Sequence, residues 1–302
     1  MVTLLSLRFK NVVHYSTHTM KSFLKKVSIV VLIIIALVFI FAFIKHKVDQ
    51  SYSSDSGSIV NDPNIPTTEE GRRSLEEAYL AYAVDRSLFP YALIEIPALR
   101  NIATSTDSFG KYLALSLFPG QELKNGGVRS EVSIDYPYKE GDTVEYSWEF
   151  RIPKDFTSDA PKNRWWVFAN WHDQPDKNKG ETWDTYQAHS APIIFGYGSK
   201  EGKDFVSLST GLDGSEKGIV PRGLIPITRD TWHSIRMVVT WSQTDTGRVI
   251  VYVDGSPSSS FDSKGPNMLN AYQHYMKIGQ YRHPEIQAES TIHLKNISIV
   301  KR

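Results

Sequence analysis

The sequence predicts an all-β protein, an antiparallel β-sandwich of the jelly-roll type, preceded by one transmembrane helix and one short amphipathic helix. About ten short apolar or alternating runs follow one another toward the C-terminus, each bounded by Gly, Pro, Asp or Asn. One uninterrupted apolar run of 18 residues stands near the N-terminus. The sequence shows no βαβ alternation, no Gly-rich phosphate loop and no long internal repeat.

The N-terminal segment predicts membrane anchoring. Residues 1–26 carry five Lys or Arg and no acid, and residues 27–44 are apolar except for Ser28. The positive-inside bias therefore predicts a basic cytoplasmic segment at 1–26, a signal anchor at 27–44 and a periplasmic or extracellular remainder. A cleaved signal peptide, with translation beginning at Met20 instead of Met1, is the alternative and would give a secreted protein.

A linker and a helix are expected before the sandwich. Residues 45–66 are polar and rich in Ser, Asp and Pro, which is typical of a flexible linker. Thr67 and Glu70 form a capping-box pattern. Apolar residues then recur at helical spacing, which predicts an amphipathic helix from about 68 to 88 on the outside of the main domain.

The main domain is expected to span residues 67–302, with the sandwich at about 92–302. The predicted strands are "KYLALSLF", "VRSEVSI", "TVEYSWEFRI", "RWWVFANWH", "APIIFGYG", "DFVSLST", "WHSIRMVVTW", "RVIVYVDG", "YMKIGQYR" and "TIHLKNISIV".

Composition limits the partners and the chemistry. The chain of 302 residues is 41% hydrophobic and 22% charged, as expected of a folded protein. Its formal net charge of +1 gives no overall field, so attraction for a charged partner must be local, and nucleic acid is not expected as a partner. The absence of cysteine excludes disulfides, a cysteine nucleophile and thiolate metal sites. We expect a monomer.

Three of the predicted strands carry large polar side chains on one face, because successive side chains of a strand point to opposite faces. The sets are Arg129 and Glu131 in "VRSEV", Phe168, Asn170 and His172 in "WVFANWH", and Tyr275, Lys277 and Tyr281 in "YMKIGQYR", where Gly279 leaves space. If the three strands are neighbours, they form a carbohydrate-sized groove that holds cations, phenols and an imidazole and that tolerates anions.

Each of these residues also has a purely structural explanation. Arg129 and Glu131 could form an ion pair on an exposed strand, and His172 could be a satisfied surface or core histidine. Tyr275 and Tyr281 could be packing residues, because aromatic residues favour strands. Only the coincidence of the three strands favours a functional site.

The motifs "GGVRSEV", "WVFANWHDQPD", "APIIFGYG", "DTWHSIRMVVTWSQTDTGRVIVYVDG" and "YMKIGQYR" occur in the order seen in one group of enzymes. From about Ala98 to the C-terminus the chain resembles the heparin lyase I-like polysaccharide lyases, which are related to glucuronan and alginate lyases of jelly-roll fold. The R-S-E-hydrophobic and Y-x-K-x-G-x-Y elements are fairly specific together. The Trp-His to Val-Asp-Gly segment is less specific, because many concanavalin-like domains share it.

The resemblance implies β-elimination on an acidic, uronate-containing polysaccharide. The C5 carboxylate must be neutralised, a base must remove the C5 proton, and an acid must protonate the departing O4. The resemblance implies that Arg129 and Asn170 neutralise the carboxylate, that Tyr281 is the phenol that acts as acid and could also act as base, and that His172 is the base or a second neutraliser. It further implies that Lys277 is a cation that favours the phenolate and that Glu131 holds Arg129 in place. Tyr275 and Arg282 are expected to bind substrate. Gly279 is expected to let the sugar approach the backbone.

Two departures from the alginate lyase pattern keep the substrate open. Those enzymes usually have Gln-x-His where this chain has Asn170-Trp171-His172, and Asn is one methylene shorter. Ser133 stands where the common R-S-E-L-R motif has a second arginine. The uronate, the linkage and the endo or exo mode are therefore left open.

The loop after His172 contributes further candidates. Trp183 and Tyr186 are predicted either as sugar-stacking platforms or a lid over the groove, or as residues that only pack the loop. No cofactor is expected. Asp173, Asp176 and Asp184 leave a weak calcium site open but do not indicate one.

Two other functions remain as alternatives. A non-catalytic concanavalin-like glycan-binding module would use the same fold, but it would not need the joint presence of Arg129, His172, Lys277 and Tyr281. A glycoside hydrolase needs two carboxylates that flank the scissile bond, and the strand-borne Glu-x-Asp-x-x-Glu pattern of such enzymes is absent.

Overall fold

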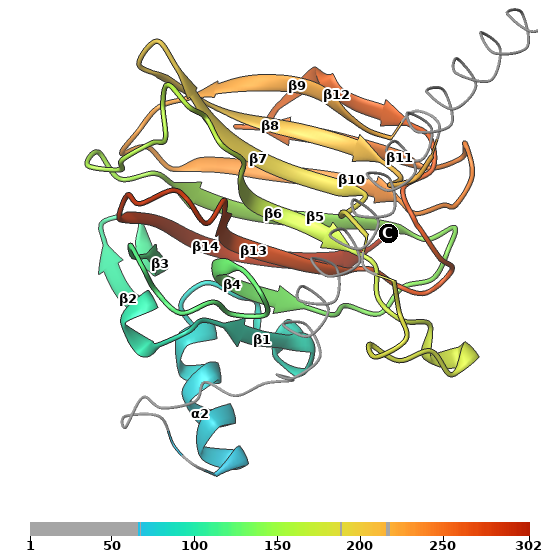
Figure 1. The fold of residues 1–302 in the computed structure, drawn as a ribbon, viewed down its shortest axis with the longest axis horizontal. Helices are drawn as coiled ribbons and strands as arrows, with labels where there is room; N and C mark the ends of the chain where they lie inside the picture. The colour runs from blue at the N-terminus through green and yellow to red at the C-terminus, as the bar shows by residue number, and fades with distance from the viewer. Residues whose placement is uncertain (1–65, 67, 188, 216–217) are drawn as a thin grey trace, which may run out of the picture. The chain divides into compact units, whose positions relative to one another are not determined.

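Two seven-stranded antiparallel sheets make up the body of the protein (Figure 1), as the sequence predicts. The computed structural model describes residues 66, 68–187, 189–215 and 218–302, and for 256–260 the backbone alone. The predicted segments 1–26 and 27–44, and the predicted linker up to residue 65, lie outside the described residues. Among the residues described, no helix is long and apolar enough to cross a membrane.

The first sheet has the order β1-β4-β13-β6-β7-β8-β9. Its strands are β1 (Ala92–Glu95), β4 (Val128–Ile134), β13 (Tyr275–Arg282), β6 (Trp166–His172), β7 (Ile193–Lys200), β8 (Lys203–Gly211) and β9 (Ile219–Ile227). In the second sheet the order is β12-β11-β10-β5-β14-β3-β2. Its strands are β12 (Ser256–Lys264), β11 (Arg248–Val253), β10 (His233–Thr240), β5 (Thr143–Arg151), β14 (Ser290–Lys301), β3 (Gly110–Leu117) and β2 (Ile102–Asp107).

All ten predicted strands are present, and the strands that the sequence did not reveal are β1, β2, β9 and β12. These are the edge strands of the two sheets. An edge strand pairs on one side only and tolerates proline, so its sequence is under weaker pressure to alternate. The "IVPRGLIPI" of β9, with two prolines and a glycine, shows why such a strand escapes detection.

The predicted helix is shorter than expected and begins at a different cap. Helix α2 spans Glu69–Leu80, and the Thr68 side chain accepts the N-terminal cap bond from the Gly71 amide at 3.1 Å. The predicted cap residue Thr67 lies outside the described residues. The helix ends early because Val84 pairs in parallel with Ile297 of β14, which draws the chain into the sandwich.

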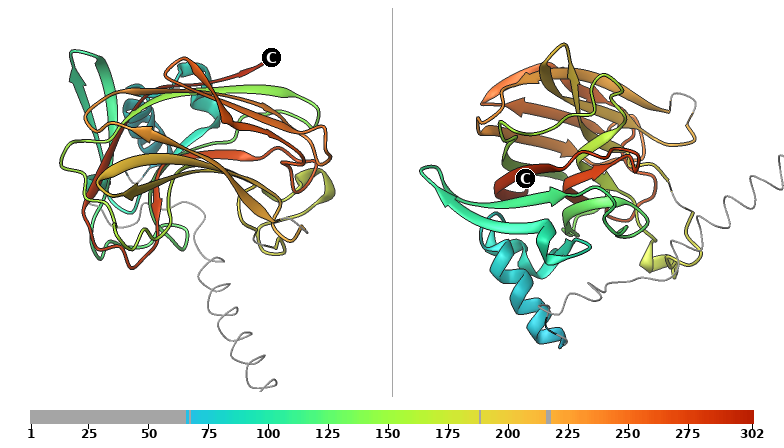
Figure 2. Two further views of the ribbon diagram at one scale, coloured as in Figure 1. Left: turned by 90° about the horizontal axis from the view of Figure 1, so that it is seen from above. Right: turned by 60° about the vertical axis from the view of Figure 1, so that its left-hand side comes forward.

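Aromatic side chains fill the space between the two sheets. Figure 2 shows the backbone of the sandwich from two further sides. Trp171 of the first sheet meets Trp148 and Tyr146 of the second, with ring centroids 6.1 and 5.2 Å apart. Burial of such large apolar side chains is the main stabilising term of a sandwich of this kind. The core therefore fixes the backbone of β6, whose opposite face carries polar candidates.

Strands β4, β13 and β6 are neighbours, which confirms the condition for a shared polar groove. Lys277 of β13 lies opposite Ser133 of β4 and opposite Asn170 of β6. Figure 1 shows β13 between the other two strands. Residues far apart in the sequence thus come together on one face.

The predicted face of Phe168 is wrong. A register shift between Val167 and Ala169 opposite β7 marks a β-bulge in β6, and such an extra residue reverses the alternation. Phe168 is therefore buried in the core, stacked on Tyr197 at 5.2 Å. Val167 takes its place beside Tyr281.

Candidate active site

The polar candidates lie on the face of the first sheet that points away from the second sheet. Met276 and Ile278 of β13 are buried in the core, so the alternate residues Tyr275 and Lys277 point outward. Tyr281 continues this outer face, where it lies opposite Arg129 of β4.

Tyr281 is held between a cation and an indole. The guanidinium carbon of Arg129 lies 4.3 Å from the centroid of the Tyr281 ring. On another side, the Trp165 ring meets Tyr281 edge-on at 4.7 Å, and Trp165 itself is 43% exposed. A side chain at Gly127 would come within 2.5 Å of the Tyr281 ring, so the glycine there allows this packing.

Arg129 is buried and paired with two carboxylates. Its Nη1 donates to Glu131 Oε2 at 3.2 Å and lies 3.8 Å from Glu95 Oε2, and the side chain is only 8% exposed. Burial acts to lower the pKa of Arg129, but the charges of Glu131 and Glu95 outweigh it and raise the pKa. The guanidinium is therefore fixed in its charged form beneath the Tyr281 ring.

Lys277 forms an ion pair with Glu95. Its Nζ donates to Glu95 Oε2 at 2.7 Å and lies 5.4 Å from the centroid of the Tyr275 ring. Lys277 and Tyr281 lie four positions apart on β13, so their Cα atoms are about 13 Å apart. The cation that packs on the Tyr281 ring is thus Arg129, whereas Lys277 is paired with Glu95.

The sequence analysis missed Glu95. It ends β1 opposite Glu131, so two buried carboxylates stand side by side. Burial raises the pKa of Glu131, and the Arg129 charge offsets this only in part. For Glu95, burial also acts to raise the pKa, but Lys277 and Arg129 outweigh it and the pKa is lowered. Strand β1 is too short, at four residues, for alternation to reveal its outward glutamate.

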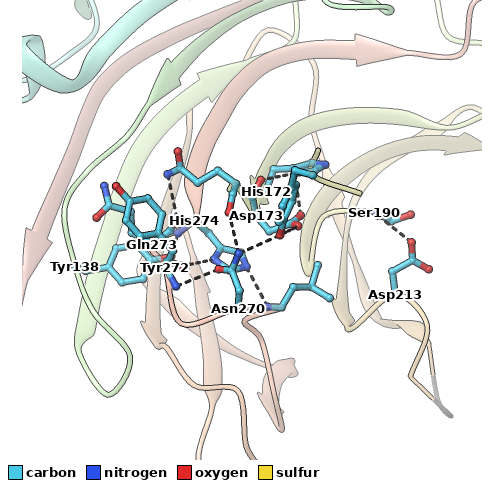
Figure 3. A network of polar contacts seen from close by, with 12 residues as sticks. Tyr138, His172, Asp173, Ser190, Asp213, Asn270, Tyr272, Gln273 and His274 are labelled. Atoms are coloured by element: carbon cyan, nitrogen blue, oxygen red, sulfur yellow. Dashed lines mark hydrogen bonds and ion pairs between the residues drawn. The ribbon is translucent and has the colours of Figure 1, made fainter. Parts of the chain in front are cut away.

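His172 lies at the other end of the outer face. Its Nδ1 is 3.0 Å from Asp173 Oδ1 and 2.9 Å from the Asp173 carbonyl oxygen. The imidazole stacks on the Tyr275 ring at 5.8 Å. Burial acts to raise the pKa of Asp173, but the hydrogen bonds and charge of His172, together with Tyr186, lower it. Figure 3 shows the His172 and Asp173 side chains above the chain segment that leads into β13.

Tyr186 anchors the loop after β6. Its hydroxyl donates to Asp173 Oδ2 at 2.5 Å and accepts from Asn270 Nδ2 at 3.0 Å. Burial and the Asp173 charge raise the pKa of Tyr186. The structure therefore favours loop packing for this residue over a sugar platform.

Trp183 is the exposed aromatic residue of the same loop. It is 59% exposed and meets Tyr186 and Tyr275 edge-on, with ring centroids 6.1 and 6.2 Å apart. The indole thus stands at the border of the outer face next to His172, where a sugar ring could stack on it.

The structure separates the two candidates for proton transfer. His172 lies five positions along β6 from Val167, the neighbour of Tyr281, which corresponds to about 16 Å along the strand. Asn170 lies between them, opposite Lys277 and opposite Ile194 of β7. Arg129 and Tyr281 are therefore brought together, and His172 is not brought to Tyr281.

Arg282 lies on the opposite face, which contradicts its predicted role in substrate binding. The side chain is fully buried, donates from Nη1 to Ser290 Oγ at 3.1 Å and stacks on Trp166 at 5.2 Å. Being next to Tyr281 in an extended strand places Arg282 on the reverse side of the sheet. It stabilises the sandwich and has no access to the outer face.

Gly279 serves the backbone of the sheet and not the approach of a sugar. Its φ of 149° is unfavourable for other residues, and an added Cβ would lie 2.3 Å from the Ser130 carbonyl oxygen of β4 and 2.9 Å from Leu115 of the second sheet. The missing side chain therefore permits the pairing of β13 with β4.

A buried histidine behind the site gives the protein a defined sensitivity to acid. His274 accepts at Nε2 from the Leu269 amide at 3.2 Å, and its Nδ1 lies 3.1 Å from the Tyr272 carbonyl oxygen (Figure 3). These partners suit the neutral imidazole. Burial lowers the pKa of His274 from 6.5 to about 4.

We expect the free energy of unfolding to fall by about 3 kcal/mol between pH 6.5 and pH 4 because of His274. The unfolded chain binds this proton below about pH 6.5, and the folded protein binds it only below about pH 4, so acid favours unfolding in that window. Denaturant unfolding at several pH values checks this. The His274→Gln variant should lose this part of the pH dependence, and an unchanged slope would contradict the assignment.

Neither a metal-binding cluster nor a pocket adds to the site among the described residues. No group of three or more His, Asp or Glu side chains among them is arranged to hold a metal ion. A shallow depression of about 330 Å³ lies on the outer face of the second sheet, lined in part by Ser147, Arg236 and Tyr252. Arg236 there is already paired with Glu145 at 2.7 Å. None of the candidate site residues predicted from the sequence lines that depression.

The sequence matches a known protein family. The sequence model of the polysaccharide lyase family matches residues 97–298. An endo-β-1,4-glucuronan lyase from the fungus Trichoderma reesei has a similar fold, with a TM-score of 0.50, 12% identity, and coverage of 67% of this chain and 87% of that one. No curated protein matches the sequence.

Two alginate lyases are also among the similar structures. Alginate lyase Aly36B, solved with an alginate trisaccharide, has a TM-score of 0.45 and 15% identity, and covers 70% of this chain and 98% of its own. The alginate lyase AlyA1 from Zobellia galactanivorans has a TM-score of 0.43 and 16% identity, and covers 66% of this chain and 80% of its own.

Proposed function

This chain belongs to the polysaccharide lyase family, and we propose that it cleaves a uronate-containing polysaccharide by β-elimination. The observation that carries the proposal is the outward-facing Tyr281 phenol beside the buried Arg129 cation. A phenol next to a fixed positive charge can give up and take back a proton, as β-elimination requires. The fold likeness to a glucuronan lyase makes polyuronates the first substrates to test.

In the proposed reaction, a base removes the C5 proton of the uronate. The electron pair of the C5–H bond forms the C4=C5 double bond while the C4–O4 bond breaks, and its electron pair leaves with O4, which takes up a proton. The products are an unsaturated uronate end and a new hydroxyl end. Negative charge develops on the carboxylate during proton removal, so a preorganised positive charge lowers the barrier.

We assign both proton transfers to Tyr281. Its phenolate accepts the C5 proton, and the same hydroxyl then donates to O4, so no second group has to reach the sugar from the other end of the sheet. Arg129 stabilises the phenolate and the charge that develops on the substrate carboxylate. The separation of His172 from Tyr281 supports this single-residue assignment.

His172, Asn170 and Tyr275 then belong to substrate binding at neighbouring sugars. They lie along the same outer face, on β6 and β13. Asn170 is the nearest of the three to Tyr281 along the strands, and His172 and Tyr275 lie opposite each other farther away. A polysaccharide that lies along this face would meet Tyr281 with one sugar and His172 with another. In this assignment His172 acts as the second neutraliser of a uronate carboxylate.

An absorbance assay tests the proposed function. The full-length chain is mixed with alginate, glucuronan, heparin and related polymers, and the ultraviolet absorbance of the C4=C5 double bond conjugated to the carboxylate is followed. We expect a rise with at least one polyuronate. Binding to these polymers with no rise in absorbance across the panel would overturn the proposal and favour a glycan-binding module.

We expect the Trp183→Ala variant to raise KM about 2- to 12-fold with little change in kcat. Stacking of a sugar ring on the exposed indole would be lost, an effect in the range measured for single aromatic contacts. Steady-state kinetics on the preferred polymer check this. The Trp183→Phe variant should retain most of the affinity, and an unchanged KM in Trp183→Ala would show that the indole only packs the loop.

A further inference from the structure

Glu95 brings a carboxylate to the active site from outside the segment that the family model matches. It ends β1, on the N-terminal side of residues 97–298. Its side chain nevertheless contacts both cations of the outer face. A residue on the N-terminal side of the matched segment thus completes the candidate site.

The contacts of Glu95 are short and buried. Its Oε2 accepts from Lys277 Nζ at 2.7 Å and from Asn125 Nδ2 at 2.8 Å, and it lies 3.8 Å from Arg129 Nη1. The side chains of Glu95 and Lys277 are each only 8% exposed. A buried ammonium without a partner is costly, so this carboxylate determines where the Lys277 charge can reside.

The N-terminal segment holds Glu95 firmly in place. Arg73 Nη1 of α2 donates to the Ala92 carbonyl oxygen at 2.8 Å, and Glu76 Oε1 accepts from the Ile94 amide at 3.3 Å. These side chains cover the open edge of β1. The buried side chains of Ala92 and Ile94 fix the strand to the core, so Glu95 has a defined position.

The four buried charges of the site balance one another. Arg129 and Lys277 contribute two positive charges, and Glu131 and Glu95 contribute two negative charges. The uronate carboxylate would bring a further negative charge to this balanced group. Loss of the Glu95 charge would leave one excess positive charge and would free Lys277 to attract the substrate away from Arg129.

We propose that Glu95 is a positioning residue of the lyase site, which holds the Lys277 ammonium against β1 and so reserves Arg129 and Tyr281 for the reacting uronate. This inference rests on the proposed function. Lys277, in turn, is kept from binding the substrate in an unproductive position.

The first test needs no substrate. Full-length wild type and Glu95→Gln are treated with an amine-acylating reagent, and the modification of Lys277 is measured by mass spectrometry. We expect about five-fold or greater labelling in Glu95→Gln, because only the neutral amine is acylated and Lys277 has lost the carboxylate that holds it in place and acts to raise its pKa. The matched control is Glu76→Gln, the same change on the same segment with no contact to Lys277, and it should label as wild type does. Equal labelling of Lys277 in wild type and Glu95→Gln would overturn the proposal.

The second test uses a polymer that the wild type cleaves. We expect KM and kcat of Glu95→Gln to fall together by about five-fold, because the anionic substrate binds more tightly but in an unproductive position. KM should also depend more steeply on salt, because the additional attraction is electrostatic. Glu95→Asp, which keeps the charge, should restore most of kcat, and it replaces the Gln variant in both tests if that variant does not fold. A lower kcat at unchanged KM, shared with Glu76→Gln, would show a merely structural role. If the wild type cleaves no polyuronate, the proposed function fails, and the labelling still decides the position of Lys277.

Discussion

The Tyr281→Phe variant is expected to fold normally and to lose about 100- to 10,000-fold in kcat, the usual contribution of general acid–base catalysis. The substitution removes only the hydroxyl, so the ring keeps its contacts with Arg129 and Trp165. With the single-residue assignment, both proton transfers are lost at once. Steady-state kinetics with the ultraviolet assay measure the effect, and thermal unfolding checks the fold.

The matched control is Tyr275→Phe. Tyr275 lies on the same strand and the same face, but its ring stacks on His172, whereas the Tyr281 ring packs on Arg129. We expect a much smaller loss of kcat, with the main effect on KM. If Tyr275→Phe were the more damaging change, the reacting centre would lie at the His172 end of the face and our assignment of Tyr281 would be wrong.

Alternation along single strands predicted much of this site. Arg129, Glu131 and Tyr281 lie where a period of two places them, because β4 and β13 pair without a register shift. The same reasoning failed for Phe168, because the bulge in β6 inserts an extra residue. A bulge depends on the pairing of two strands, and a single sequence does not contain that information.

The partner of Lys277 and the burial of Arg282 were not predicted from the sequence. Glu95 is distant from Lys277 along the chain, and only the order of the sheet brings the two side chains together. Arg282 was predicted to bind substrate, although the neighbour of an outward residue in a strand must point inward. Glu95 was missed because its contact depends on the order of the strands in the sheet. Strict application of the alternation would have placed Arg282 correctly.

The Arg129→Met variant is expected to lose activity almost completely and also to lose about 3–5 kcal/mol of stability, as is usual when one partner of a buried ion pair is removed. Glu131 is fully buried and would be left without its main counter-charge. Loss of activity alone therefore does not show whether Arg129 acts in catalysis or only in folding, because both roles predict it.

The double variant Arg129→Met/Glu131→Leu separates the two roles. Two apolar side chains of similar volume replace the buried pair, and such replacements are often neutral or stabilising. Denaturant unfolding should therefore show most of the stability restored, with a coupling energy measured by the double-mutant cycle. Activity should remain absent, because the positive charge beside Tyr281 is still missing. If activity returned together with stability, Arg129 would be a structural residue, and the charge that stabilises the transition state would have to come from another group, of which Lys277 is the nearest candidate on the same face.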